Sequence, residues 1–125
     1  MVVDTSVVLA IFFDEPHAEW AAEQLASAAN LQMSTVNLAE ALVRLRDARP
    51  TIADELEARL LSSGIRFVPP DVSQARLAAA ARLRYPLDLG DCFAYALAAT
   101  EGASILTLDR DFRALDVPVI LPPPR

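Results

Sequence analysis

The stretch Val2-Val3-Asp4-Thr5-Ser6 opens the chain and leads directly into the apolar residues 7–13. Two valines followed by an acid predict a short buried strand that ends at Asp4. Thr5 or Ser6 stands where a helix N-cap belongs, so a helix is expected to follow at once. A strand that turns straight into a helix is typical of parallel α/β sheets, in which ligands bind outside the carboxyl ends of the strands.

The same alternation of apolar runs and helically spaced residues continues along the chain. Besides residues 2–3, we predict strands at 31–36, 65–68, 104–108 and 117–121. Helices are predicted at 7–13, 16–29, 37–48, 52–63, 71–84 and 91–101, with one helical turn at 111–115. Thr51 and either Asp71 or Ser73 are assigned as N-caps, and Gly64 and Gly102 as C-caps.

The predicted strands lack a two-residue alternation of apolar and polar side chains, which indicates burial on both faces. The expected fold is therefore α/β, a three-layer α/β/α sandwich with a central, mostly parallel sheet. Residues 1–121 are expected to form a single domain, and residues 122–125 a loose C-terminal tail.

Composition excludes several kinds of chemistry. The 125 residues include one cysteine, Cys92, and one histidine, His17, so an intrachain disulfide, a multi-cysteine zinc site and a histidine pair are excluded. No lysine occurs among the 11 basic residues and only three glycines are present, which excludes a phosphate-binding P-loop. Carboxylates, hydroxyls, amides and arginine remain, and they favour a hard metal ion with oxygen ligands. The N-terminal apolar run is too short for a membrane span and no signal peptide is apparent, so a cytoplasmic protein is expected.

Five acids fall where the predicted sheet would bring them to one edge: Asp4, Glu40, Asp91, Asp109 and Asp111. Two carboxylates about 4–5 Å apart repel by roughly 3–4 kcal/mol at an effective dielectric constant near 20. Such a cluster stays ionised only around a cation, and Mg²⁺ or Mn²⁺ suits oxygen ligands. Of the 17 acids these five leave 12 against 11 arginines, so the net charge of −6 does not forbid a phosphate substrate.

Each acid also has a local interpretation. Asp4 is placed to cap a helix, Glu40 has capping-box spacing from Asn37, and Asp91 complements a helix dipole. Asp109 and Asp111 are ordinary turn residues. Five separate local roles at one sheet edge are the less economical explanation, but spacing alone leaves both open.

Four segments resemble the PIN-domain family, and in particular the VapC toxins of bacterial VapBC toxin–antitoxin pairs. They are residues 2–6, residues 34–40, the segment Leu89-Gly90-Asp91-Cys92-Phe93-Ala94-Tyr95-Ala96-Leu97-Ala98, and the segment Leu106-Thr107-Leu108-Asp109-Arg110-Asp111-Phe112. The resemblance implies a metal-dependent endoribonuclease that cuts RNA, a homodimer, and a VapB-type antitoxin as partner.

By motif position, the resemblance also implies site residues. Asp4, Glu40, Asp91 and Asp109 correspond to the family's acidic quartet, with Asp111 as a fifth acid nearby. Asp4, Asp91 and Asp109 are the expected metal ligands, and Thr5, Ser6 and Thr107 are expected to support them through their hydroxyls. Asp88 departs from the family pattern: it either adds charge to the rim of the site or is a solvated residue of the loop 85–90, and the loop interpretation is favoured.

Other functions remain open from the sequence. A phosphoaspartate enzyme or receiver domain is disfavoured because it typically needs a lysine. A catalytically inactive PIN-like module that binds a protein or RNA is disfavoured because an acidic cluster without a metal destabilises a fold. A DNA nuclease is not distinguished. Few basic residues are available to hold RNA phosphates, and the candidates are Arg44, Arg46, Arg82, Arg84, Arg110 and Arg113.

Overall fold

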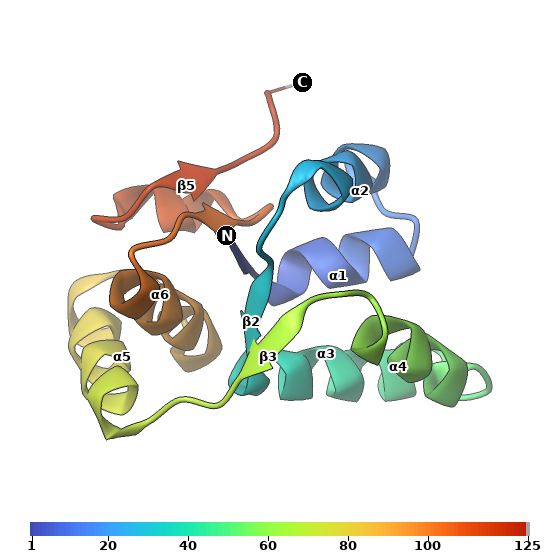
Figure 1. The fold of residues 1–125 in the computed structure, drawn as a ribbon, viewed down its shortest axis with the longest axis horizontal. Helices are drawn as coiled ribbons and strands as arrows, with labels where there is room; N and C mark the ends of the chain where they lie inside the picture. The colour runs from blue at the N-terminus through green and yellow to red at the C-terminus, as the bar shows by residue number, and fades with distance from the viewer. Residues whose placement is uncertain (125) are drawn as a thin grey trace.

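A computed structural model, which describes residues 1–124, contains a five-stranded sheet in the order β3-β2-β1-β4-β5. Every neighbouring pair of strands is parallel. The strands are β1 (Val2–Val3), β2 (Gln32–Ser34), β3 (Arg66–Val68), β4 (Ile105–Leu106) and β5 (Val119–Ile120). The predicted α/β architecture with a parallel central sheet is confirmed, and the first strand of the sequence occupies the centre of the sheet (Figure 1).

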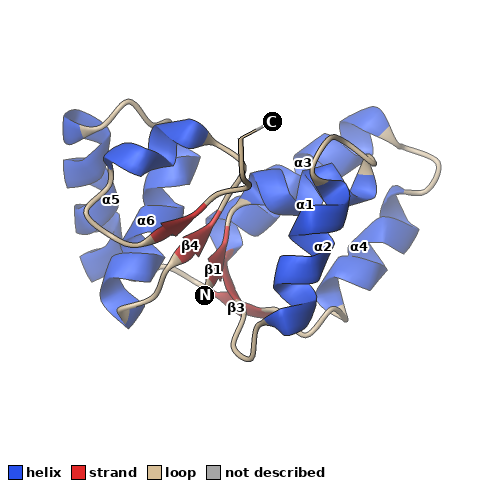
Figure 2. Ribbon diagram, turned by 90° about the horizontal axis from the view of Figure 1, so that it is seen from above, coloured by secondary structure: helices blue, strands red, loops and turns tan. Residues whose placement is uncertain are grey.

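Helices cover both faces of the sheet: α1 to α4 lie on one side and α5 and α6 on the other (Figure 2). They are α1 (Thr5–Phe12), α2 (Ala18–Ser27), α3 (Thr35–Ala48), α4 (Ala53–Leu61), α5 (Val72–Arg84) and α6 (Leu89–Glu101), followed by the 3₁₀ helix η1 (Arg110–Ala114).

Alternation along the central strands divides the core in two. Val2 and Ile105 are fully buried against α5 and α6. Their neighbours Val3 and Leu106 are fully buried on the other face, in the cluster formed with α1 to α4. Side chains of successive strand residues point to opposite faces, so two residues per strand are enough to anchor both helix layers. Because both faces of these strands are packed against helices, the positions of the strand ends are fixed.

Several helix starts differ from the sequence predictions. Asp4 is the N-cap of α1, as its local interpretation had it, in place of the predicted Thr5 or Ser6, because its carboxylate accepts from the Ser6 amide. The helix predicted from Pro16 starts at Ala18, since His17 has a left-handed backbone (φ 74°). Thr51 caps nothing, because α4 begins after Ile52 without a side-chain cap.

Of the two predicted C-caps, Gly102 is confirmed and Gly64 is wrong, since α4 ends at Leu61 with Ser62 as its C-cap. Gly102 ends α6 in the left-handed conformation (φ 63°), as predicted, and Asp71 caps α5. In the expected tail, Pro122 is buried and its carbonyl accepts a hydrogen bond from Arg110 at 3.5 Å. Arg125 lies outside the described residues. Within residues 1–124, no helix combines the length and apolar character needed to cross a membrane.

Candidate active site

Asp4 lies at the carboxyl end of β1, in the middle of the sheet, and is 2 % exposed. One carboxylate oxygen, Oδ2, accepts hydrogen bonds from Ser6 Oγ at 2.7 Å and Thr107 Oγ1 at 2.9 Å. The other oxygen, Oδ1, is buried without any hydrogen-bond partner among the described residues. Burial raises the pKa of Asp4, and the hydroxyl donors offset part of that rise. One oxygen is thus held by two hydroxyl donors, and the other is left without a partner in the fold.

The two hydroxyls that hold Asp4 also connect β1 to the end of β4. Ser6 Oγ accepts from the Leu108 amide at 3.0 Å, and Thr107 Oγ1 accepts from the Asp109 amide at 3.0 Å. Each hydroxyl therefore donates to Asp4 and accepts from the chain beyond β4. This network sets the position of Asp109 relative to Asp4 across 105 residues of sequence.

Glu40 is held from two sides in the second turn of α3. Asn37 Nδ2 donates to Glu40 Oε1 at 3.0 Å, and Thr5 Oγ1 lies at 3.4 Å from the same oxygen. Asn37 is fully buried, and its amide also donates to the Gly90 carbonyl at 3.0 Å. Glycine at residue 90 leaves room for the Glu40 carboxylate, because a Cβ there would overlap it. A single buried amide thus ties Glu40 to the beginning of α6.

Asp88 and Asp91 form the opposite wall, at the start of α6. Asp88 is the N-cap, and its Oδ1 accepts from the Asp91 amide at 2.9 Å. Partial burial raises the pKa of Asp91 to about 8, and the negative charges of Asp4, Asp88, Asp109 and Glu40 add to this rise. Without a cation, Asp91 therefore holds a proton near neutral pH.

Asp109 and Asp111, the last two of the five predicted acids, differ in their position relative to the cavity. Asp109 is the N-cap of η1, and its Oδ1 accepts from the Asp111 amide at 2.9 Å. Asp109 faces the same cavity as Asp4, whereas Asp111 is exposed and lies outside the residues that line it. The capping turn places the two acids in different surroundings.

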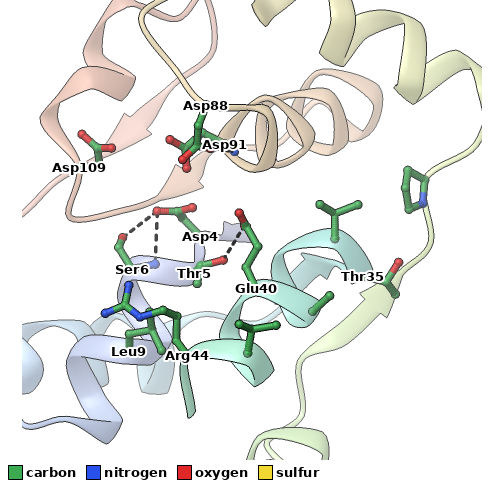
Figure 3. Close-up of a pocket in the computed structure, with 14 residues that line it drawn as sticks. Asp4, Thr5, Ser6, Leu9, Thr35, Glu40, Arg44, Asp88, Asp91 and Asp109 are labelled. Atoms are coloured by element: carbon green, nitrogen blue, oxygen red, sulfur yellow. Dashed lines mark hydrogen bonds between the residues drawn. The ribbon is translucent and has the colours of Figure 1, made fainter. Parts of the chain in front are cut away.

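The acidic side chains described above, apart from Asp111, line one open cavity of about 940 Å³ beside the carboxyl ends of the central strands. Its acids are Asp4, Glu40, Asp88, Asp91 and Asp109. Figure 3 shows them entering from opposite sides, with Asp88, Asp91 and Asp109 across from Asp4 and Glu40. Arg44 is the one basic side chain among the described residues that line the cavity.

The donor set suits a divalent cation. The unpartnered Oδ1 of Asp4 and the raised pKa of Asp91 both indicate negative charge that lacks compensation. Within residues 1–124, no three His, Cys, Asp or Glu side chains are already gathered closely enough to hold a metal ion. Mg²⁺ is commonly bound by one or two carboxylates and keeps several waters, which matches such an open site.

Four of the five predicted acids are brought together, and Asp111 is not. The expected supporting hydroxyls Thr5, Ser6 and Thr107 all contact the acids. For Asp88 the favoured loop interpretation is wrong about the site, since this residue lies on the cavity wall besides capping α6. The three-residue spacing from Asp88 to Asp91 is that of a side-chain cap and indicates a helix start rather than a solvated loop.

The supporting role of the buried Asn37 was missed. The three-residue spacing from Asn37 to Glu40 corresponds to a side-chain contact inside α3, whose N-cap is Ser34. Nothing local signals the contact of Asn37 with Gly90.

The chain is similar to known proteins over most of its length. Residues 1–118 match the PIN domain. Ribonuclease VapC42 of Mycobacterium tuberculosis is 36% identical over 127 residues, covering 94% of this chain and 96% of the relative. Ribonuclease VapC of Mycolicibacterium smegmatis is 35% identical over 129 residues, covering 96% and 99%.

Among solved structures, M. tuberculosis VapC20, described as a sarcin–ricin loop cleaving toxin, superposes with a TM-score of 0.83 at 21% identity, covering 97% of this chain and 98% of that one. A toxin–antitoxin complex from Klebsiella pneumoniae superposes with a TM-score of 0.74 at 21% identity, covering 95% and 94%. The fold, the position of the acids and the full-length likeness to curated relatives lead to one conclusion: the chain belongs to the PIN-domain family, in its VapC branch.

Proposed function

We propose that this chain is an endoribonuclease, the toxin of a VapBC-type toxin–antitoxin pair, and that it cuts RNA with the help of Mg²⁺ or Mn²⁺. Full-length likeness to proteins named VapC ribonuclease supports the activity. The observation that carries the proposal for this site is the buried, unpartnered Oδ1 of Asp4 in a cavity with four further acids.

The proposed roles follow from the surroundings of each side chain. Asp4 and Asp91 would hold the cation, and Asp109 would join them directly or through water. Glu40, held by Asn37 and Thr5, is positioned to orient a water molecule toward the phosphate. When bound, the cation would lower the pKa of a water and offset charge on the phosphate. Attack by water with departure of the 3′ oxygen gives a 5′-phosphate product.

The same family likeness supports the partners. Solved relatives include VapBC assemblies, one from Rickettsia felis bound to a DNA fragment from its promoter. We propose a VapB-type antitoxin as the partner that restrains this chain, a homodimer as its assembly, and the cytoplasm, where cellular RNA is available, as its location. Asp111, outside the cavity, is proposed to have at most a minor part in catalysis.

The test is cleavage of total bacterial RNA by the purified chain with Mg²⁺ or Mn²⁺, with and without EDTA. Defined fragments carrying a 5′-phosphate, lost with EDTA and in Asp91→Asn, are the expected result. RNA binding without cleavage at any metal concentration would instead identify a PIN-like binding module.

A further inference from the structure

A second hollow adjoins the acid cavity. Its volume is about 390 Å³, and it shares four lining residues with the acid cavity: Ser6, Leu9, Arg44 and Asp109. The two hollows are therefore parts of one groove, with Arg44 at the junction. In Figure 3 the Arg44 side chain extends from α3 across Leu9 toward Ser6, at the edge of the acids.

Arg44 differs from its neighbour on the same helix. Within residues 1–124, both ion pairs belong to Arg46, which contacts Asp54 at 3.0 Å and Glu57 at 2.9 Å. Arg44 takes part in neither pair, although it lies one helical turn beyond Glu40. Of the six arginines that the sequence offered for RNA binding, Arg44 alone lines the acid cavity within the described residues. Its guanidinium is free to donate to a phosphate.

The far side of the second hollow is built by the turn before α2. Glu15, Pro16 and His17 line it, and the turn has two non-glycine residues with positive φ, Asp14 at 50° and His17 at 74°. A carboxylate and an imidazole suit a base or ribose: His17 offers a flat ring for stacking, and Glu15 accepts hydrogen bonds but repels a phosphate. The hollow thus has the chemistry of a nucleoside subsite.

We propose that the RNA strand runs from the acid cavity past Arg44 into the second hollow. Arg44 binds the phosphate next to the scissile one, and the nucleoside attached to it lies against His17. This inference rests on the proposed ribonuclease function and adds to it the path of the strand and the residues that hold it. Arg44 supplies at the junction the positive charge that the acid walls lack.

Arg44→Gln is the direct test, with Arg46→Gln as the matched control on the same helix. The substrate is a single-stranded RNA oligonucleotide spanning a cut mapped in total RNA. We expect Arg44→Gln to raise KM by about tenfold, more than it lowers kcat, because a charge-assisted contact to the phosphate is lost. The slope of log binding constant against log salt concentration should decrease in magnitude by about one, which corresponds to the loss of one phosphate contact. Arg44→Lys should restore part of the lost affinity and part of the salt dependence.

Replacing single phosphates by neutral methylphosphonates locates the contact. One position beside the cut should weaken wild-type binding and leave Arg44→Gln unaffected. His17→Asn, which keeps a residue type that adopts positive φ, should raise KM by about fivefold through lost stacking. If the wild type cleaves RNA but Arg44→Gln leaves KM and salt dependence unchanged, the inference about Arg44 is overturned and the proposed ribonuclease function stands. An unchanged KM in His17→Asn would overturn the nucleoside subsite, and a wild-type chain that cuts no RNA would overturn both proposals.

Discussion

Asp4 and Asp91 face the same cavity, yet their carboxylates are held in opposite ways. Asp4 Oδ2 accepts from two hydroxyls that are themselves fixed by backbone amides beyond β4. Asp91 is positioned through its backbone, by the Asp88 cap, and its carboxylate is surrounded by other acids. The fold thus fixes the position of Asp4, whereas the charge of Asp91 depends on what occupies the cavity.

The most severe test of this comparison removes each acid in turn. Asp4→Asn or Asp91→Asn should lower the RNA cleavage rate by more than about a hundredfold, because losing a ligand costs more than losing its supporting contacts. Single-turnover cleavage measures the loss. The exposed Asp47→Asn on α3 serves as control, and Asp111→Asn should lose far less than either. Full activity in Asp91→Asn would remove this residue from the mechanism.

Gly90→Ala tests the link between the two walls. A methyl group at residue 90 overlaps the Glu40 carboxylate, which is the end of a flexible side chain and can swing away. We expect the fold to persist and cleavage to fall by about tenfold or more, since Glu40 loses its contact with Asn37. Thermal melting and cleavage are measured together. In a Glu40→Ala background the same substitution should have no further effect, and an additive loss would contradict this explanation.

Cation binding should raise the thermal stability of the folded chain. Mg²⁺ or Mn²⁺ is expected to raise the Tm of the wild type by several degrees, because a ligand that binds only the folded state stabilises it. The double variant Asp4→Asn/Asp91→Asn, which lacks both proposed ligands, should show no such rise. Equal shifts in the two proteins would place the cation elsewhere.

The smallest expected effect is on the pH dependence of stability without metal. Asp91 has a pKa of about 8 in the folded chain against an ordinary 3.8, so the folded state holds a proton that the unfolded state releases between these values. Stability should therefore fall as pH rises through this window. Melting curves at pH 5 and pH 8 would show a smaller difference for Asp91→Asn than for the wild type. An identical difference would show that other groups are responsible.

The sheet and most of the site were predictable because both depend on short-range patterns. Apolar runs such as Val2-Val3 mark strands, and acids that follow them gather at one edge because parallel strands end there. Asp111 has the same local pattern as Asp109, and only the capping turn separates them. Asn37 was predictable only in part: its spacing from Glu40 indicates their contact, but its contact with the Gly90 carbonyl joins residues 53 positions apart, and no local spacing encodes it.

The central position of β1 has a consequence for synthesis. Val2 and Val3 are synthesised long before Ile105 and Leu106, and they complete their pairing only when those residues arrive beside them. The hydroxyl of Thr107 and the carboxylate of Asp109 arrive with the same late segment. A nascent chain that stops short of this segment has no assembled acid cavity. The activity proposed for this cavity thus depends on a segment that is translated long after Asp4.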